Sequence, residues 1–189
     1  MLRFRHASGT YAKPVNGVQG FRRCLARGAA PTLTSMSTRT LPVSIVRGGT
    51  SRAVFLPMSA LPESQAARDE LCLRLIGSPD PQAVDGLGGG VSSNSKVMFV
   101  GPSDRADLET LFAQVYPTEA SVDWTGNCGN ISSAVLHYAR HTGLFPGDRA
   151  RVWNRNSEAL FELVLLDDHV DMRFLSPGGE KCGEIFPVG

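Results

Sequence analysis

The sequence predicts an α+β domain in which a sheet dominates and two helices accompany it. Short apolar runs separated by Gly, Pro, Asp and Ser follow one another from residue 41 onwards, which is typical of strands and turns. Two longer segments instead carry apolar residues at helical spacing. With 189 residues, 42% of them hydrophobic, the chain is long enough for one ordinary domain with a buried core.

Seven segments are predicted to be strands because they are short apolar runs bounded by turn residues. They are residues 42–46, 53–56, 97–100, 106–116, 150–153, 159–166 and 170–175. The first two flank a polar, glycine-rich turn and therefore predict a hairpin. Residues 106–116 also fit a helix, since Leu108, Leu111 and Phe112 have helical spacing, but we favour a strand.

The two predicted helices have recognisable ends. Residues 61–76 carry Pro62 near their start, and Gly77 follows their last apolar residue. Residues 127–144 place apolar side chains at packing intervals, with Gly143 near the end. No internal repeat or low-complexity tract interrupts this order.

The charge balance excludes several classes of partner. Nineteen Lys and Arg against eighteen Asp and Glu leave a formal net charge of +1, so no overall field attracts nucleic acid or an anionic membrane. No uncharged apolar run approaches the roughly 18 residues that a membrane-spanning helix needs. The cysteines lack the paired spacing of zinc or redox sites, and we expect reduced thiols. They are Cys24, Cys72, Cys128 and Cys182.

Residues 1–38 differ in composition from the rest of the chain. The first acidic residue is Glu63, whereas Arg occurs repeatedly before it. An Arg-rich, acid-free segment is typical of mitochondrial transit peptides. A disordered extension, or a gene start placed too early with Met36 beginning the protein, explains the same composition. We expect residues 1–38 to stand outside the fold, residues 39–189 to form the domain, and the protein to be cytoplasmic or mitochondrial.

Three loops combine glycines with reactive side chains, at residues 47–52, 85–96 and 124–130. Glycine lets the backbone approach a ligand and exposes amide donors, so such loops are candidate binding sites. Taken singly, each is more often only a tight turn. Three in one small domain weaken that interpretation.

The glycine loops do not fit the common nucleotide-binding motifs. A Walker loop requires Gly before its Lys and Ser or Thr after it, whereas Ser95 precedes Lys96 and Val97 follows. The dinucleotide motif fails at Val91, where its last glycine belongs. Both nucleotide interpretations are therefore rejected.

Two side chains in these loops are candidates for acid–base chemistry. Lys96 lies at a loop-to-strand junction, where partial desolvation would lower its pKa and supply a neutral amine as a base. Cys128 lies at the expected start of the second helix, where the helix dipole stabilises a thiolate or an anionic ligand. The simpler alternatives are a solvated surface lysine and a small buried cysteine.

The histidines suggest two weaker alternatives. His137 and His141 lie four residues apart on the second helix, but no third metal ligand and no zinc-protease motif accompany them. A cysteine hydrolase would need a histidine beside Cys128, for which His169 is the available candidate. We expect a solvated or packing pair in the first case and keep the second as a distant option.

Five motifs follow one another in order along the chain. They are Arg47-Gly-Gly-Thr-Ser-Arg52, Ser78-Pro-Asp-Pro81, Asp85-Gly-Leu-Gly-Gly89, Ser95-Lys-Val97 and Trp124-Thr-Gly-Asn-Cys-Gly-Asn130. This series resembles the 2-methylaconitate cis-trans isomerase and 4-oxalomesaconate tautomerase family, over roughly residue 41 to the end. Five ordered motifs make the resemblance more specific than any single glycine loop.

The resemblance implies a diaminopimelate-epimerase-like fold, in which a curved, mostly antiparallel sheet wraps around a central helix, here residues 127–144. Members have two such lobes with the substrate between them, so residues 39–189 would be the N-terminal lobe alone. Members shift a proton within an unsaturated di- or tricarboxylate without a metal or organic cofactor. The resemblance makes Lys96 the expected base and Cys128 the second acid–base group.

Such a substrate needs hydrogen-bond donors for its carboxylates, and the three glycine loops are the expected source. The expected substrate-binding residues are Thr50, Ser51, Gly88, Gly89, Ser93, Ser95, Asn127, Gly129 and Asn130. The expected partners are a small polycarboxylate and either a second lobe or a second copy of the chain. The alternative function is an inactive, single-lobe remnant or truncated gene product that binds a carboxylate or a partner without turnover.

Overall fold

The computed structural model describes residues 2–4, 39–167, 169–182 and 186–188. It divides into two units, Met1–Leu41 and Pro42–Gly189. In the first unit, β1 (Leu2–Phe4) pairs antiparallel with β2 (Arg39–Leu41). Residues 5–38, which make up most of the expected leader, lie outside the described residues, so the nature of the leader stays a prediction.

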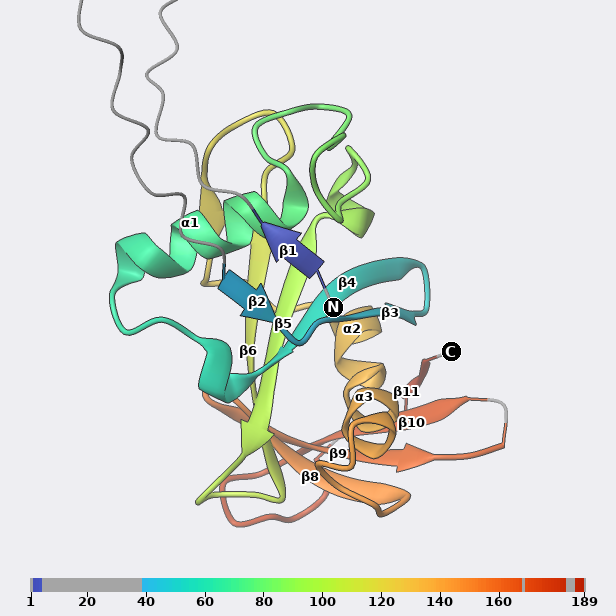
Figure 1. Cartoon of the computed structure of the whole chain (residues 1–189). Helices are drawn as coiled ribbons and strands as arrows, with labels where there is room; N and C mark the ends of the chain where they lie inside the picture. Colours follow the sequence, from blue (N-terminus) through green and yellow to red (C-terminus); the bar gives the residue numbers. More distant parts are fainter. Residues whose placement is uncertain (1, 5–38, 168, 183–185, 189) are drawn as a thin grey trace, which may run out of the picture. The chain divides into compact units, whose positions relative to one another are not determined.

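The second unit is a nine-stranded sheet that curls around a helix (Figure 1). Its strands are β3 (Ser44–Gly48), β4 (Ser51–Pro57), β5 (Lys96–Pro102), β6 (Leu108–Val115), β7 (Val122–Asp123), β8 (Arg149–Asn154), β9 (Ala159–Leu165), β10 (Val170–Leu175) and β11 (Phe186–Val188). Their order is β11-β10-β9-β8-β6-β5-β4-β3, and β7 pairs with β6. The pairs β4–β5 and β6–β8 are parallel and the other described pairs are antiparallel. The predicted α+β class with a curved, mostly antiparallel sheet is confirmed.

The predicted hairpin is formed by β3 and β4. Gly48 pairs with Ser51, which leaves Gly49 and Thr50 as a two-residue turn. Gly49 has φ of +49°, a conformation that glycine adopts without steric cost. The residues that the sequence assigned to the turn therefore include the ends of both strands.

The first predicted helix is observed as α1 (Gln65–Ile76), which begins four residues later than expected. Ser64 caps it, because its side-chain oxygen accepts a hydrogen bond from the Ala67 N–H at 3.3 Å. The residues before it form a short 3₁₀ turn, Met58–Ala60, followed by extended backbone at Leu61. Gly77 ends the helix in the left-handed conformation, as the sequence predicts.

The second predicted helix is observed as two consecutive short helices, α2 (Gly129–Ser133) and α3 (Val135–His141). Ala134 between them keeps helical dihedral angles, and its N–H bonds to Ile131 in a tighter, 3₁₀-type turn. Cys128 has extended backbone and is the N-cap, so α2 begins later than the predicted residue 127. The chain runs on in the same direction through both helices (Figure 1).

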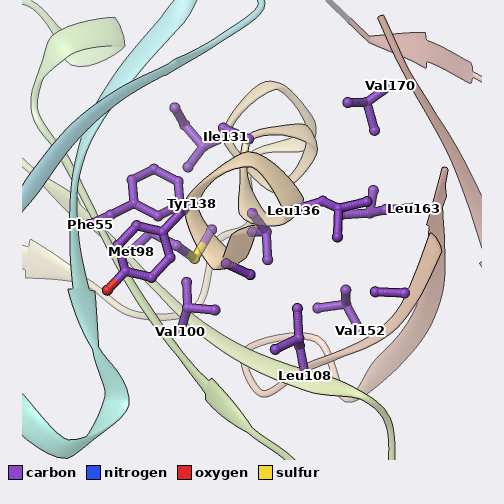
Figure 2. Packing of buried hydrophobic residues seen from close by; sticks show 14 of the residues in the cluster. Phe55, Met98, Val100, Leu108, Ile131, Leu136, Tyr138, Val152, Leu163 and Val170 are labelled. Carbon is purple, nitrogen blue, oxygen red and sulfur yellow. The ribbon is translucent and has the colours of Figure 1, made fainter. Parts of the chain in front are cut away.

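The core lies between this pair of helices and the inner face of the sheet. Figure 2 shows Phe55, Met98 and Val100 on one side of the helices, and Val152, Leu163 and Val170 on the other. The rings of Phe55 and Tyr138 lie 5.2 Å apart between centroids. The buried residues of this cluster are 7% exposed or less. The central-helix arrangement that the family resemblance implies is therefore present.

The outer face of the same strands packs against α1, which contacts β5, β6 and β7. β5 is buried on both faces, so its neighbouring residues alternate between two environments. Met98 and Val100 join the inner core, whereas Phe99 stacks with Trp124 at 6.3 Å between centroids. The same alternation places Lys96, the first residue of β5, on the inner face.

No helix in the described part of the chain is long and apolar enough to cross a membrane.

Candidate active site

Two of the three glycine loops meet where the β3–β4 hairpin packs on the start of α2. A Cβ atom on Gly48 would lie 1.9 Å from the carbonyl oxygen of Asn130, so only glycine allows this approach. The Asn130 side-chain amide donates a hydrogen bond to Thr50 Oγ1 at 2.9 Å. Cys128 Sγ donates to Ser51 Oγ at 3.8 Å. Four of the predicted site residues are thus brought together.

Lys96 lies beside this junction on the inner face of the sheet. It pairs with Ala53 in the parallel register of β4 and β5, two residues beyond Ser51. The residue is only 7% exposed, which is unusual for lysine. Its Nζ atom donates to Gln114 Oε1 and lies 5.8 Å from the centroid of the Phe112 ring. The expectation of a partly desolvated lysine is therefore met.

The surroundings of Lys96 favour the neutral form of its amine more than water favours the neutral form of an exposed lysine. Burial lowers the pKa of the Lys96 amine below its ordinary value, because the charged form loses hydration. A Cys128 thiolate acts in the opposite direction and raises the pKa of Lys96, so the two groups are close enough to influence each other. The net result is a lowered pKa. An amine in this state can accept a proton, and a thiol beside it can supply one.

The loop at residues 85–95 makes different contacts. The Gly88 N–H donates to the Ile76 carbonyl oxygen at 3.1 Å, and Arg52 Nη2 donates to the Gly88 carbonyl at 3.3 Å. Ser95 is fully buried, and its hydroxyl donates to the Val91 carbonyl at 2.9 Å. These donors are already engaged within the protein. The substrate-binding roles of Gly88, Gly89 and Ser95 stay predictions, as does that of Ser93 in the 3₁₀ turn Ser92–Asn94.

Asn127 and Gly129 flank the cysteine at the start of α2. Asn127 Oδ1 accepts hydrogen bonds from the Cys128 N–H at 2.8 Å and from Ser132 Oγ at 3.3 Å. Asn127 therefore fixes the backbone on which the cysteine sits. Gly129 packs against the Met172 side chain, since a Cβ at this glycine would lie 3.6 Å from the methionine methyl group.

The three histidines in the described part of the chain make other contacts. His137 and His141 are exposed on α3 and line a groove of about 600 Å³ beside β3. No group of three or more His, Cys, Asp or Glu in the described residues is arranged to hold a metal ion. His169 Nε2 lies 3.3 Å from Asp171 Oδ1, next to β10.

Comparison with known proteins decides the family. Residues 38–166 match the family model described as PrpF protein. The chain belongs to the PrpF family. The resemblance inferred from the five motifs is thereby confirmed.

Several curated relatives of this PrpF-family chain are isomerases by name. A 2-methyl-aconitate isomerase from Shewanella oneidensis is 35% identical over 82% of this chain and 50% of its own length. A 3-methylitaconate isomerase from Eubacterium barkeri is 46% identical over 79% of this chain and 46% of its own length. A 4-oxalomesaconate tautomerase from Pseudomonas putida is 32% identical over 82% of this chain and 50% of its own length. The chain spans about half the length of these relatives.

A solved structure supports the fold assignment. The crystal structure of a methylitaconate-delta-isomerase superposes with a TM-score of 0.65 at 34% sequence identity. The match covers 70% of this chain and 41% of that protein. The fold of this PrpF-family chain is therefore similar to that of one part of this methylitaconate-delta-isomerase.

Sequence reasoning missed one residue of the site, Gln114. It lies inside the predicted strand 106–116, away from every glycine loop, and nothing in its local sequence marks it. It reaches Lys96 only because β5 and β6 pair in a register that sets the two residues opposite each other. The pairing register is the signal that identifies it, and that register depends on contacts between strands.

Proposed function

We propose that this chain carries the acid–base half of an isomerase site that moves a proton within small unsaturated di- or tricarboxylic acids, without a metal or an organic cofactor. The observation that carries the proposal is the buried Lys96, whose amine has a lowered pKa, on the inner face of the sheet beside the junction that holds Cys128. The names of the relatives agree with it, since methylaconitate, methylitaconate and oxalomesaconate are all unsaturated polycarboxylates.

In the proposed reaction, the proton transfers involve only Lys96 and Cys128. The neutral Lys96 amine takes a proton from the carbon next to the double bond, which gives an ammonium and an anion delocalised over the double bond and a carboxylate. The proton returns to the far carbon, which moves the double bond, or to the original carbon after rotation, which exchanges cis and trans. Cys128 is the second acid–base group and donates or accepts a proton on the other side of the substrate.

The carboxylates of the substrate are proposed to bind at the junction of the hairpin and α2. Thr50 is exposed at the tip of the hairpin and is already hydrogen-bonded to Asn130, so the two side chains are held in a fixed relation. Donors that are fixed before the substrate binds stabilise developing charge without further reorganisation. The remaining contacts are proposed to come from a second lobe, in a longer polypeptide or in a second chain.

Proton exchange measured by ¹H NMR tests the proposal. The purified chain is incubated with trans-aconitate or 2-methylaconitate in deuterated water, and the loss of C–H signal and the appearance of the other isomer are followed. We expect exchange that is lost in Lys96→Met and kept in Lys181→Met, which changes an exposed lysine outside the site. Exchange that persists in Lys96→Met would show that Lys96 is not the base.

The same experiment addresses the alternative function. If the folded wild-type chain shows no exchange, titration calorimetry with trans-aconitate distinguishes a lobe that binds a carboxylate without turnover from one that does not bind it. Binding that weakens in Thr50→Val would support the hairpin site even without catalysis.

A further inference from the structure

The Gln114 side chain occupies a position that the proposed reaction makes important. Gln114 lies on β6 directly opposite Lys96 in the antiparallel register of β5 and β6. Its Oε1 atom accepts the hydrogen bond from Lys96 Nζ. A buried amine needs such a partner, because an unpaired polar group away from water is costly.

The other end of the Gln114 amide is fixed by the glycine loop. Its Nε2 atom donates to the carbonyl oxygens of Ser95 at 2.9 Å and Ser92 at 3.1 Å, and lies 3.2 Å from the Val115 carbonyl. Turning the amide over would set its oxygen against these carbonyl oxygens and its NH₂ group against the lysine. Only the observed orientation satisfies both ends.

The orientation of the Gln114 amide decides which of its atoms is presented to the Lys96 amine. Because Gln114 presents Oε1 to the amine, the lysine donates one N–H to it, which fixes the direction of the remaining substituents on Nζ. The same amide joins Lys96 to the loop that carries Ser92 and Ser95. A movement of this loop would therefore be transmitted to the position of the amine.

We propose that Gln114 is a positioning residue for the isomerase site, which holds the Lys96 amine in place through Oε1 and connects it to the loop at residues 92–95. The effect of Gln114 on catalysis rests on the proposed function, in which Lys96 is the base. The hydrogen-bond network itself belongs to the folded chain and can be measured without substrate.

The charged surroundings of Lys96 determine the expected direction of each substitution. The titratable group that acts on Lys96 is Cys128 at the start of α2, and the Phe112 ring centroid lies 5.8 Å from Lys96 Nζ. Gln114→Met removes the acceptor and should lower the Lys96 pKa further, because the charged amine loses its hydrogen bond. Gln114→Glu keeps an acceptor and adds a negative charge, which should raise it.

The test follows Lys96 by NMR in the full chain labelled with ¹³C-lysine, where the ε-carbon shift reports protonation. The sequence has three lysines, Lys13, Lys96 and Lys181, so Lys96→Met assigns the signal. We expect the Lys96 titration midpoint to fall in Gln114→Met and to rise in Gln114→Glu. Gln82→Met, which makes the same change at an exposed loop position, should leave it unchanged.

The proposal would be overturned if the Lys96 titration midpoint stayed the same in Gln114→Met and Gln114→Glu, or if it moved in the same direction in both. If Gln114→Met does not fold, a rise in Gln114→Glu alone decides the question. Where the chain catalyses exchange, Gln114→Met should also reduce kcat about 10-fold or more with little change in KM. A wild-type chain without exchange would count against the proposed function, while the NMR titration would still test Gln114.

Discussion

The glycine-rich turn at residues 47–52 and the glycine-rich loop at residues 85–95 look alike in sequence, but their glycines make different contacts. Gly48 lets the hairpin approach the start of α2, where a side-chain amide and a thiol meet the hairpin hydroxyls. Gly88 packs its backbone on the end of α1 instead, and its N–H is bonded to Ile76. One loop forms part of the surface beside Lys96, whereas the other mainly fixes the position of its own backbone.

This difference shows that glycine content alone does not identify a binding loop. The deciding property is whether the backbone and side-chain donors remain available after the loop has packed. The loop at residues 85–95 still contributes to the site, but indirectly, through the carbonyl oxygens that hold Gln114. The comparison can be tested by substitutions in each loop.

The largest effect is expected from Gly48→Ala. The added methyl group would lie 1.9 Å from a backbone oxygen of Asn130, which cannot move without displacing the start of α2. We expect the free energy of unfolding to fall by about 3 kcal/mol, measured by urea denaturation. Gly126→Ala is the control, because its nearest neighbour would lie at 3.5 Å, and it should change stability by less than about 0.5 kcal/mol. Equal effects of the two substitutions would refute the close approach.

A somewhat smaller effect is expected from Gly88→Ala in the other loop. Its new methyl group would lie 2.6 Å from the Ile76 carbonyl oxygen and 2.7 Å from the Ile76 Cγ2 methyl group, which is a less severe approach than the one at Gly48. We expect a loss of about 2 kcal/mol and faster hydrogen exchange at the Gly88 amide. An unchanged exchange rate at this amide would contradict its bond to Ile76.

The smallest effect is expected from Thr50→Val at the tip of the hairpin. This substitution keeps the shape of the side chain and removes the oxygen that accepts from Asn130 at 2.9 Å. Because Thr50 is exposed, water replaces the lost partner, and stability should fall by about 0.5 to 1 kcal/mol. Thr118→Val, the same change at another exposed position, should have a smaller effect on the urea midpoint. If the two variants behave alike, the Asn130–Thr50 bond does not stabilise the hairpin.

The sequence predicted the elements of this fold because apolar spacing and turn residues are local signals. Its errors are local too: α1 begins at Gln65 because Ser64 caps it, and the second helix tightens at Ala134. The family resemblance pointed to Lys96 and Cys128. Gln114 could not be found in this way, because its role depends on the register between β5 and β6 and on carbonyl oxygens of a distant loop.

The most direct test of the account is the titration of Lys96 in the wild-type chain and in Cys128→Ser, followed through the ¹³C ε-carbon shift. Burial should place the wild-type midpoint below the ordinary lysine value of 10.5. A Cys128 thiolate raises the pKa of Lys96, so its removal should lower the midpoint further. A midpoint at the ordinary value that does not move in Cys128→Ser would contradict a coupled acid–base pair on the inner face of the sheet.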